Sequence, residues 1–403
     1  FWGYLGRNDG LIVNCLYVAV YFIVSRLYKF KEWHLLFFAV TGALISLIAM
    51  FQFFNVDPLG GIEAAANPGK AHFAKRYLST IGNIDFLSWY IAMIYSLTVP
   101  MFVLAKSKYT NWLLLPLAIH SAAFYYIDVD SGKIAVAASL VVLLFLAVRS
   151  RAYLSRLLNA IALIFGAKFA CAAYFTAYYN DYTHMGGLTR SLLIALAALA
   201  AAAAVRWIKL PAGLTSKLNG KRRMLILLGI IAGAGVAGIA VLRILPQSSF
   251  SGILGDISNI LHGDIPDELG TNRVYTWRRS LILFSEHPIF GAGQDSFGAL
   301  FTRYSEDLQR LFPGEYVDKA HNIYIQMLVC TGGLSLISYL VFLGGAFYTG
   351  FKKGLKSVGA AALLLALVSY SVQAAALFSL PFVTPIFWVA AGMLVTIQKD
   401  KKL

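Results

Sequence analysis

Cysteine is scarce in this sequence, and its spacing excludes several kinds of site. The three cysteines, Cys15, Cys171 and Cys330, lie in separate apolar segments with no paired spacing and no nearby histidine. They therefore indicate no metal site and leave the redox compartment open. The chain also lacks G-x-G-x-x-G, H-E-x-x-H and C-x-x-C, and its stretch DSGK lacks the glycine-rich lead of a phosphate-binding loop. We expect no bound ATP, NAD or zinc, and no other cofactor.

Charged residues are also few, at 13% of the chain, whereas 59% of the residues are hydrophobic and the mean hydropathy is +0.69. A soluble domain of 403 residues would not be this apolar. A helix that crosses a bilayer needs about 20 consecutive, mostly apolar residues. The sequence therefore predicts an all-α polytopic membrane protein with about eleven transmembrane helices, at 10–27, 34–54, 85–105, 112–128, 132–148, 157–178, 191–207, 224–244, 322–348, 357–378 and 380–398.

Basic residues gather in the short segments that follow every second span. They are Arg26, Lys29, Lys31, Lys106, Lys108, Arg149, Arg151, Arg156, the cluster from Arg206 to Arg223, Lys352, Lys353, Lys356, Lys399, Lys401 and Lys402. The opposite short segments hold only Arg7, Lys70, Lys75, Arg76, Lys133 and Arg190. The positive-inside rule places the first set, and with it the C-terminus, in the cytoplasm. The same rule places the first residue of the sequence outside. A chain that begins outside without a signal peptide is unusual, so we expect one earlier span and about twelve in the full protein.

Acidic residues are outnumbered, 19 against 34 basic ones, and the net charge is +15. Most of this positive charge is the topology signal, which faces anionic membrane lipids. The long external stretch 245–320 instead carries more acidic than basic residues. A nucleic-acid partner is therefore not expected.

The spans and long loops divide the chain into three parts: N-terminal transmembrane helices at 1–244, a large external loop at 245–320, and C-terminal transmembrane helices at 321–403. Loops of this length are usually functional. Inside the external loop, Val274, Trp277, Leu281 and Phe284 follow a helical spacing that ends before Pro288 and two glycines. This pattern predicts an amphipathic helix at the outer interface, followed by a second helix near 294–311.

Polar residues gather where the external loop meets the next span. The stretch VDKAHN ends with His321 and Asn322 directly before a long apolar run, and Arg273, Arg278 and Arg279 lie in the loop. Guanidinium groups bind phosphate oxygens through paired hydrogen bonds, and an imidazole accepts a proton from an attacking hydroxyl near neutral pH. The set suits transfer from a lipid diphosphate. Each residue also has a structural alternative: His321 could cap the helix, and the arginines could face lipid headgroups. Arg278 and Arg279 are adjacent on a helix and point in different directions, so at most one of them is expected to reach the site.

Other polar residues are weaker candidates. Lys168 lies in the middle of a span, where a charged residue is a functional candidate, although its partner is not evident from the sequence. His120 is expected to be a hydrogen-bonded core residue. Asp128 and Asp130 in DVD are a weak match to the carboxylate pair with which many glycosyltransferases hold a metal.

Two stretches, NRVYTWRRSLILFSEHPIFGAGQDSFG (272–298) and YVDKAHNIYIQMLVCTGGLSLISYL (316–340), resemble the signature domain of the O-antigen ligase and O-antigen polymerase superfamily. The shared pattern is an arginine, a tryptophan four residues later, HP with two glycines, and HN opening a helix that contains a glycine pair. GYLGRNDG (3–10) and STIGNIDFLSWYI (79–91) resemble further motifs of the superfamily. In place of the Ser-Arg found in many members, this chain has Ser131, Gly132 and Lys133.

The resemblance implies an inverting glycosyltransferase in the bacterial inner or plasma membrane, without metal or ATP. It implies an undecaprenyl-pyrophosphate-linked glycan as donor, a hydroxyl on a glycan, lipid or protein as acceptor, and a site on the periplasmic or extracellular side. His321 is the expected catalytic base. The expected substrate-binding residues are Arg273, Asn322, Lys133, Arg279, Arg278 and Trp277.

Three alternatives stay open. The signature does not separate ligase from polymerase, and a protein O-oligosaccharyltransferase of the same superfamily would differ only in its acceptor. A transporter or flippase of a lipid-linked oligosaccharide would predict discontinuous helices and charged residues deep in several spans.

Overall fold

The computed structural model is helical throughout its described part, which comprises residues 2–3, 9–54, 56–60, 79–105, 108–179, 185–207, 220–250 and 252–397, with no strand among them. Outside these residues lie several basic residues that were used to predict topology: Arg7, Lys70, Lys75, Arg76, Lys106 and the tail lysines. Most residues of the 206–223 cluster, and most of those between the second and third predicted spans, also lie outside them. Long apolar stretches become helices because a helix satisfies every backbone hydrogen bond within itself.

A helix overlaps each of the predicted spans. These helices are α1 (Leu11–Leu27), α2 (Trp33–Phe53), α4 (Ile84–Leu104), α5 (Leu114–Ile127), α6 (Asp130–Ala147), α7 (Arg151–Tyr179), α8 (Met185–Trp207), α10 (Gly220–Ile244), α15 (Ile323–Gly354), α16 (Val358–Ala374) and α17 (Thr384–Thr396). Within the described residues, 6 helices are long and apolar enough to cross a membrane. The protein is therefore a multi-pass membrane protein, while the number eleven stays a prediction.

The chain forms two compact units, each made of several segments. Unit 1 comprises residues 1–15, 215–342 and 374–380, and unit 2 comprises 16–214, 343–373 and 381–403.

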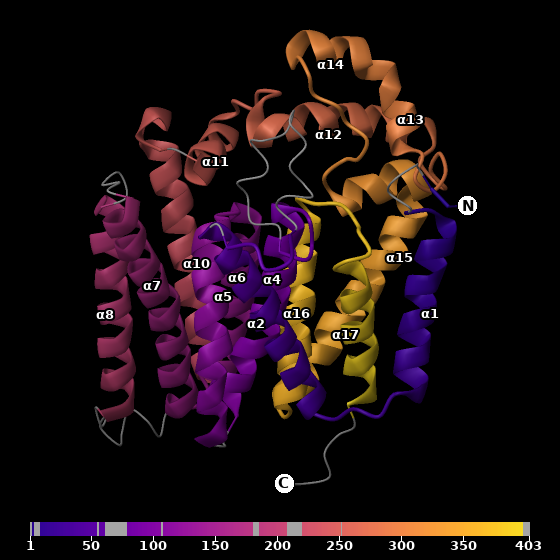
Figure 1. Cartoon of the computed structure of the whole chain (residues 1–403). Helices are drawn as coiled ribbons and strands as arrows, with labels where there is room; N and C mark the ends of the chain where they lie inside the picture. Colours follow the sequence, from indigo (N-terminus) through magenta and orange to yellow (C-terminus); the bar gives the residue numbers. More distant parts are fainter. Residues whose placement is uncertain are drawn as a thin grey trace. The chain divides into compact units, whose positions relative to one another are not determined.

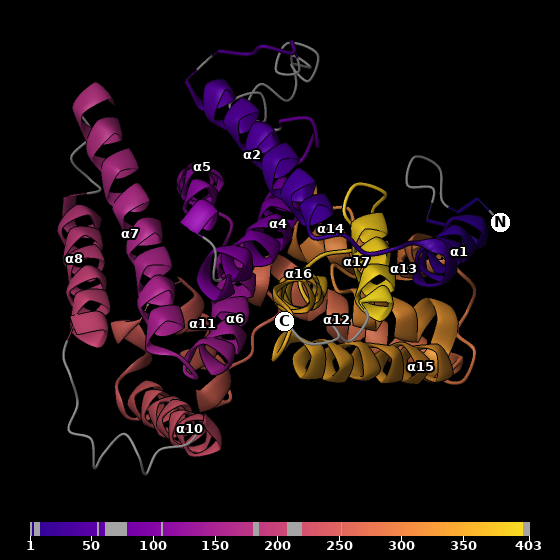
Figure 2. The same ribbon diagram turned by 90° about the horizontal axis from the view of Figure 1, so that it is seen from below.

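Unit 2 is built around α4, which contacts α2, α5, α6 and α7 and is buried along most of its length (Figures 1 and 2). Asn83 caps α4, because its side-chain oxygen accepts hydrogen bonds from the amides of Asp85 (2.8 Å) and Phe86 (3.3 Å). Trp89 of α4 stacks on Tyr370 of α16, with ring centroids 4.7 Å apart. His120 is fully buried and hydrogen-bonded to the Ser46 hydroxyl at 2.9 Å, as expected for a core histidine.

Unit 1 contains the large external loop of the sequence prediction. Within it, α12 lies crosswise to α10, and α13 and α14 lie at the same end of the unit as α12 (Figure 1). The elements of this predicted loop, called the external segment below after that prediction, are η4 (Gln247–Ser249), α11 (Gly252–His262), α12 (Leu269–Glu286), α13 (Phe297–Phe301), η5 (Thr302–Tyr304) and α14 (Ser305–Leu311). The single helix predicted near 294–311 is thus three short helices.

The face of α12 that packs within unit 1 differs from the apolar face that was predicted to lie at the membrane interface, and that interface stays a prediction. The buried residues are Tyr275, Thr276, Ser280 and Leu283, whereas Leu281 is 52% exposed. Tyr275 and Leu283 pack with Phe297, Phe301 and other residues of the external segment into an apolar core. The hydroxyls of Thr276 and Ser280 donate to carbonyls one turn earlier, at 3.2 and 2.7 Å, so polar residues are tolerated on this face.

Helix α15 is broken at Gly332, and a loop after α12 fills the break. The amides of Ala292 and Gly293 donate to the carbonyls of Val329 and Cys330, both at 2.9 Å. The amide of Gly333 donates to the carbonyl of Pro288 at 2.8 Å. The loop at 288–293 therefore satisfies backbone groups that the break removes from the helix.

Two glycines make this backbone-to-backbone packing geometrically feasible. Gly332 has φ 80° and ψ 173°, a conformation open almost only to glycine, and a Cβ there would lie 2.1 Å from the carbonyl oxygen of Ile289. A Cβ on Gly291 would lie 2.4 Å from the carbonyl carbon of Cys330. The HP-x-x-G-x-G stretch and the later glycine pair are therefore two halves of one contact.

Replacing Gly332 by alanine should destabilise the protein strongly, because both the conformation and the space exclude a Cβ. We expect a loss of at least about 2 kcal/mol in the free energy of unfolding, measured as a lower melting temperature by tryptophan fluorescence in detergent. Gly345→Ala is the matched control, since Gly345 lies in the same helix and a Cβ added there would meet nothing within 4 Å. Equal melting temperatures for the two variants would contradict this account of the break.

Candidate active site

His321 lies in the short connection between α14 and α15, in a left-handed backbone conformation with φ 48°. Its ring meets the Phe378 ring edge to face, with centroids 5.1 Å apart and an interplanar angle of 84°. A left-handed conformation costs a residue other than glycine about 1–2 kcal/mol. Contacts on both sides of His321 therefore have to hold the backbone in place.

The residues next to His321 supply those contacts. The amide of Ala320 donates to Gln326 Oε1 at 2.8 Å, and the indole Nε1 of Trp277 donates to the Ala320 carbonyl at 2.9 Å. On the other side, Asn322 caps α15, because its Oδ1 accepts from the amides of Tyr324 (3.0 Å) and Ile325 (3.2 Å). The histidine is thus fixed between a helix cap and a tethered carbonyl.

Asn322 was predicted to bind substrate, and its contacts narrow how it would do so. Its side-chain oxygen already accepts two helix amides. A substrate contact would therefore have to come from its Nδ2 amide group. Trp277, predicted for the same role, donates its single ring N–H to Ala320, so only its ring face is left for a substrate.

Arg273 lies in the first regular turn of α12. The three residues before it, Gly270, Thr271 and Asn272, are left-handed, with φ of 66°, 61° and 63°. Arg273 and Trp277 are four residues apart and share a face of the helix. Because Trp277 bonds to Ala320, the face of α12 that carries Arg273 is the one that meets the segment containing His321.

Arg278 and Arg279 have other contacts in unit 1. Arg278 forms an ion pair with Asp267, 2.6 Å between Nη1 and Oδ1, and donates to the carbonyl of Ile265 at 2.5 Å. The Arg279 guanidinium lies over the Tyr275 ring, 4.6 Å from its centroid, and near the Tyr304 ring. Both brace the external segment, and their substrate contacts stay a prediction.

Lys133 belongs to unit 2, at the start of α6. It pairs with Asp128 and with Asp130, the latter at 2.9 Å, and 43% of its side chain is exposed. The carboxylates of Asp128 and Asp130, which were compared with a metal-binding pair, thus bind the Lys133 ammonium group. In the described part of the chain no group of three metal-ligating side chains is brought together.

A buried ion cluster adjoins His321 and includes residues that the sequence did not single out. Lys319 is 1% exposed and pairs with Asp295 and, at 3.6 Å, with Asp9 Oδ2. Gln294 Nε2 also donates to the carbonyl of Asp9 at 3.0 Å. The cluster ties the segment before α1 and the loop after α12 to a residue two positions before His321. Lys319 is visible in DKAHN, but its partners are far away in sequence.

Asp9 is the weaker carboxylate partner in this cluster. Burial raises the pKa of Asp9 from 3.8 to about 6, and the nearby charge of Lys319 only partly opposes this effect. One lysine faces two carboxylates, and Asp295 makes the shorter contact. The proton of Asp9 is therefore bound more tightly in the folded chain than in the unfolded chain.

This raised pKa predicts a specific pH dependence of stability. The stabilising contribution of protonated Asp9 is complete below about pH 4 and is lost as the pH rises through about 6. In D9N that loss should be absent, so the variant should gain up to roughly 3 kcal/mol over wild type between pH 4 and pH 8. Melting temperatures measured across this range test the prediction, and parallel profiles for wild type and D9N would refute it.

A search of curated proteins found no match to this chain. A family model, described as O-antigen ligase, matches residues 182–340, which include α8, α10, the whole external segment and the first part of α15. Arg273, Trp277, His321 and Asn322 all lie within the match, whereas Lys133 and Asp9 lie outside it. The chain therefore carries an O-antigen ligase domain at 182–340, consistent with the O-antigen ligase and polymerase superfamily.

Proposed function

We propose that this protein transfers a glycan from an undecaprenyl-pyrophosphate carrier to an acceptor hydroxyl at the outer face of the bacterial inner or plasma membrane. The family match indicates a membrane glycosyltransferase role in surface-polysaccharide synthesis. The observation that carries the finer proposal is the position of His321, held in a left-handed turn at the start of α15 beside the helix face that bears Arg273.

In the proposed reaction the ring nitrogen of His321 accepts the proton of the acceptor hydroxyl. The acceptor oxygen then forms a bond to the anomeric carbon while the bond between that carbon and the pyrophosphate oxygen breaks, which inverts the configuration. The bonding electrons leave with the lipid pyrophosphate, whose developing charge Arg273 stabilises. The donor is already activated, so the protein has to position the groups and move one proton, without a metal ion.

The transporter alternative is supported by one observation, the break in α15. Discontinuous helices in transporters use freed backbone groups to bind substrates or ions. Here the loop at 288–293 occupies carbonyls of Val329 and Cys330 on one side of the break and the amide of Gly333 on the other. The break is thus closed by backbone packing, which favours the enzyme. A protein acceptor instead of a glycan or lipid acceptor would leave the proposed chemistry unchanged.

Substitution of His321 tests the proposed base without disturbing the backbone. H321N supplies a residue that tolerates the left-handed conformation but cannot act as a base. We expect its transfer rate to fall at least about 100-fold, measured with purified protein in detergent, an undecaprenyl-pyrophosphate glycan and EDTA. His262→Ala is the control, since the His262 ring is bonded to the Ser258 carbonyl within α11.

Arg273→Ala in the same assay should weaken donor binding by roughly ten- to a hundredfold, because charge-assisted hydrogen bonds to the pyrophosphate are lost. Arg310→Ala, in an exposed pair with Asp307, is its control. Wild-type transfer by H321N would exclude His321 as the base. A requirement for added Mg²⁺ or Mn²⁺ would exclude the metal-independent mechanism and direct attention to Asp128 and Asp130.

A further inference from the structure

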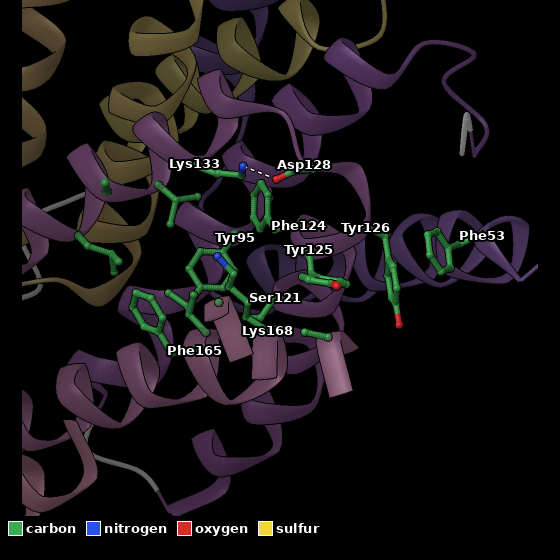
Figure 3. A pocket seen from close by; sticks show the side chains of 16 residues that line it. Phe53, Tyr95, Ser121, Phe124, Tyr125, Tyr126, Asp128, Lys133, Phe165 and Lys168 are labelled. Atoms are coloured by element: carbon green, nitrogen blue, oxygen red, sulfur yellow. Dashed lines mark hydrogen bonds and ion pairs between the residues drawn. The ribbon is translucent and has the colours of Figure 1, made fainter. Parts of the chain in front are cut away.

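Unit 2 contains a cavity of about 740 Å³ that no step of the proposed reaction uses, although Lys133, which was predicted to bind substrate, lines it. Its walls come mainly from α5, α6 and α7, with Phe53 of α2 and Tyr95 of α4 (Figure 3). Aromatic and aliphatic side chains dominate the lining, among them Phe124, Leu140, Ile164 and Phe165. A cavity of this kind inside a multi-pass membrane protein suits a hydrocarbon chain.

Lys168 of α7 also lines this cavity. It lies within the candidate membrane span Arg151–Tyr174. Among the described residues, no hydrogen bond or ion pair to its ammonium group is formed. An ammonium group in a span is costly unless a negative charge or a polar group meets it, so the ligand of the cavity is expected to bring that charge.

The second lysine of the cavity is already neutralised. The ammonium group of Lys133 turns toward Asp128 (Figure 3), and Asp130 lies 2.9 Å from it. Among the residues that the structure describes, the cavity therefore offers one cation without an ion-pair partner, Lys168, within a mainly apolar lining. A ligand with one negative charge matches it, whereas a pyrophosphate would bring at least one charge too many.

We propose that this cavity binds a membrane phospholipid with a singly charged phosphate head, which pairs with Lys168 while its chain lies against the apolar walls. This lipid is distinct from the glycan donor. The proposal does not rest on the transfer reaction.

The test compares two lipids that have identical chains. Protein purified in mild detergent is titrated with phosphatidylglycerol or with phosphatidylcholine, and bound lipid is counted by native mass spectrometry. We expect wild type to retain one phosphatidylglycerol per chain with at least tenfold preference over phosphatidylcholine. K168Q should lose that preference and K168R should keep it, because arginine restores the charge.

Two further variants separate the charge from the apolar walls. K352Q is the charge control, since Lys352 lies over the Tyr348 ring near the end of α15 and does not line the cavity. It should bind like wild type. A137F places a ring at an exposed position of the lining, so it should reduce retention of both lipids without repacking the core.

Three results would overturn the proposal. The first is equal retention of the two lipids by wild type, and the second is an unchanged preference in K168Q. The third is that a prenyl pyrophosphate displaces phosphatidylglycerol from wild type and that K168Q abolishes this displacement. The last result would assign the cavity to the donor lipid instead. Melting temperatures of the variants, measured without added lipid, establish that each one is folded.

Discussion

The backbone hydrogen bonds between the 288–293 loop and the break in α15 are the constraint on which the candidate site depends. A broken helix in an apolar environment leaves amides and carbonyls without partners, which is costly there. The loop supplies partners on both sides of Gly332 and so joins the end of α12 to the first part of α15. Trp277 then bonds to Ala320, and this contact brings the Arg273 face of α12 to the segment that holds His321. The break is therefore part of how the site is assembled, and filling it with a Cβ would disturb the site as well as the helix.

Several residues near the site adopt a backbone conformation that side chains disfavour. Thr271, Asn272, Asp295 and His321 all have positive φ. Each such conformation costs about 1–2 kcal/mol, and it persists only where surrounding contacts determine it. For Asp295 and His321 the contacts are the Lys319 ion cluster and the Asn322 cap. Strained residues held by several independent contacts are common at catalytic sites, and this agrees with the proposed role of His321.

Much of the fold could be predicted from the sequence, because long apolar stretches have only one way to satisfy their backbone in a bilayer. The boundaries of α2, α4 and α6 fall within a few residues of the prediction for this reason. The helix α12 was predicted as well, but the sequence did not show which of its faces packs against the rest of the chain, because the hydroxyls on that face bond to carbonyls of their own helix. The same logic failed at Gly332, because GG inside an apolar run does not reveal which loop will fill a break. The contact between Lys319 and Asp9 depends on residues far apart in the sequence, and no local pattern encodes it.

The structure also separates the signature residues by the reason for their presence. Gly291 and Gly332 are required by backbone packing, Asn322 caps a helix, and Trp277 tethers a carbonyl. The fold alone would explain these four residues, even if the protein catalysed no reaction. His321 is different, because a glycine would adopt its left-handed conformation without cost. Backbone requirements therefore do not account for an imidazole at this position. The proton transfer proposed for His321 would account for an imidazole at the start of α15.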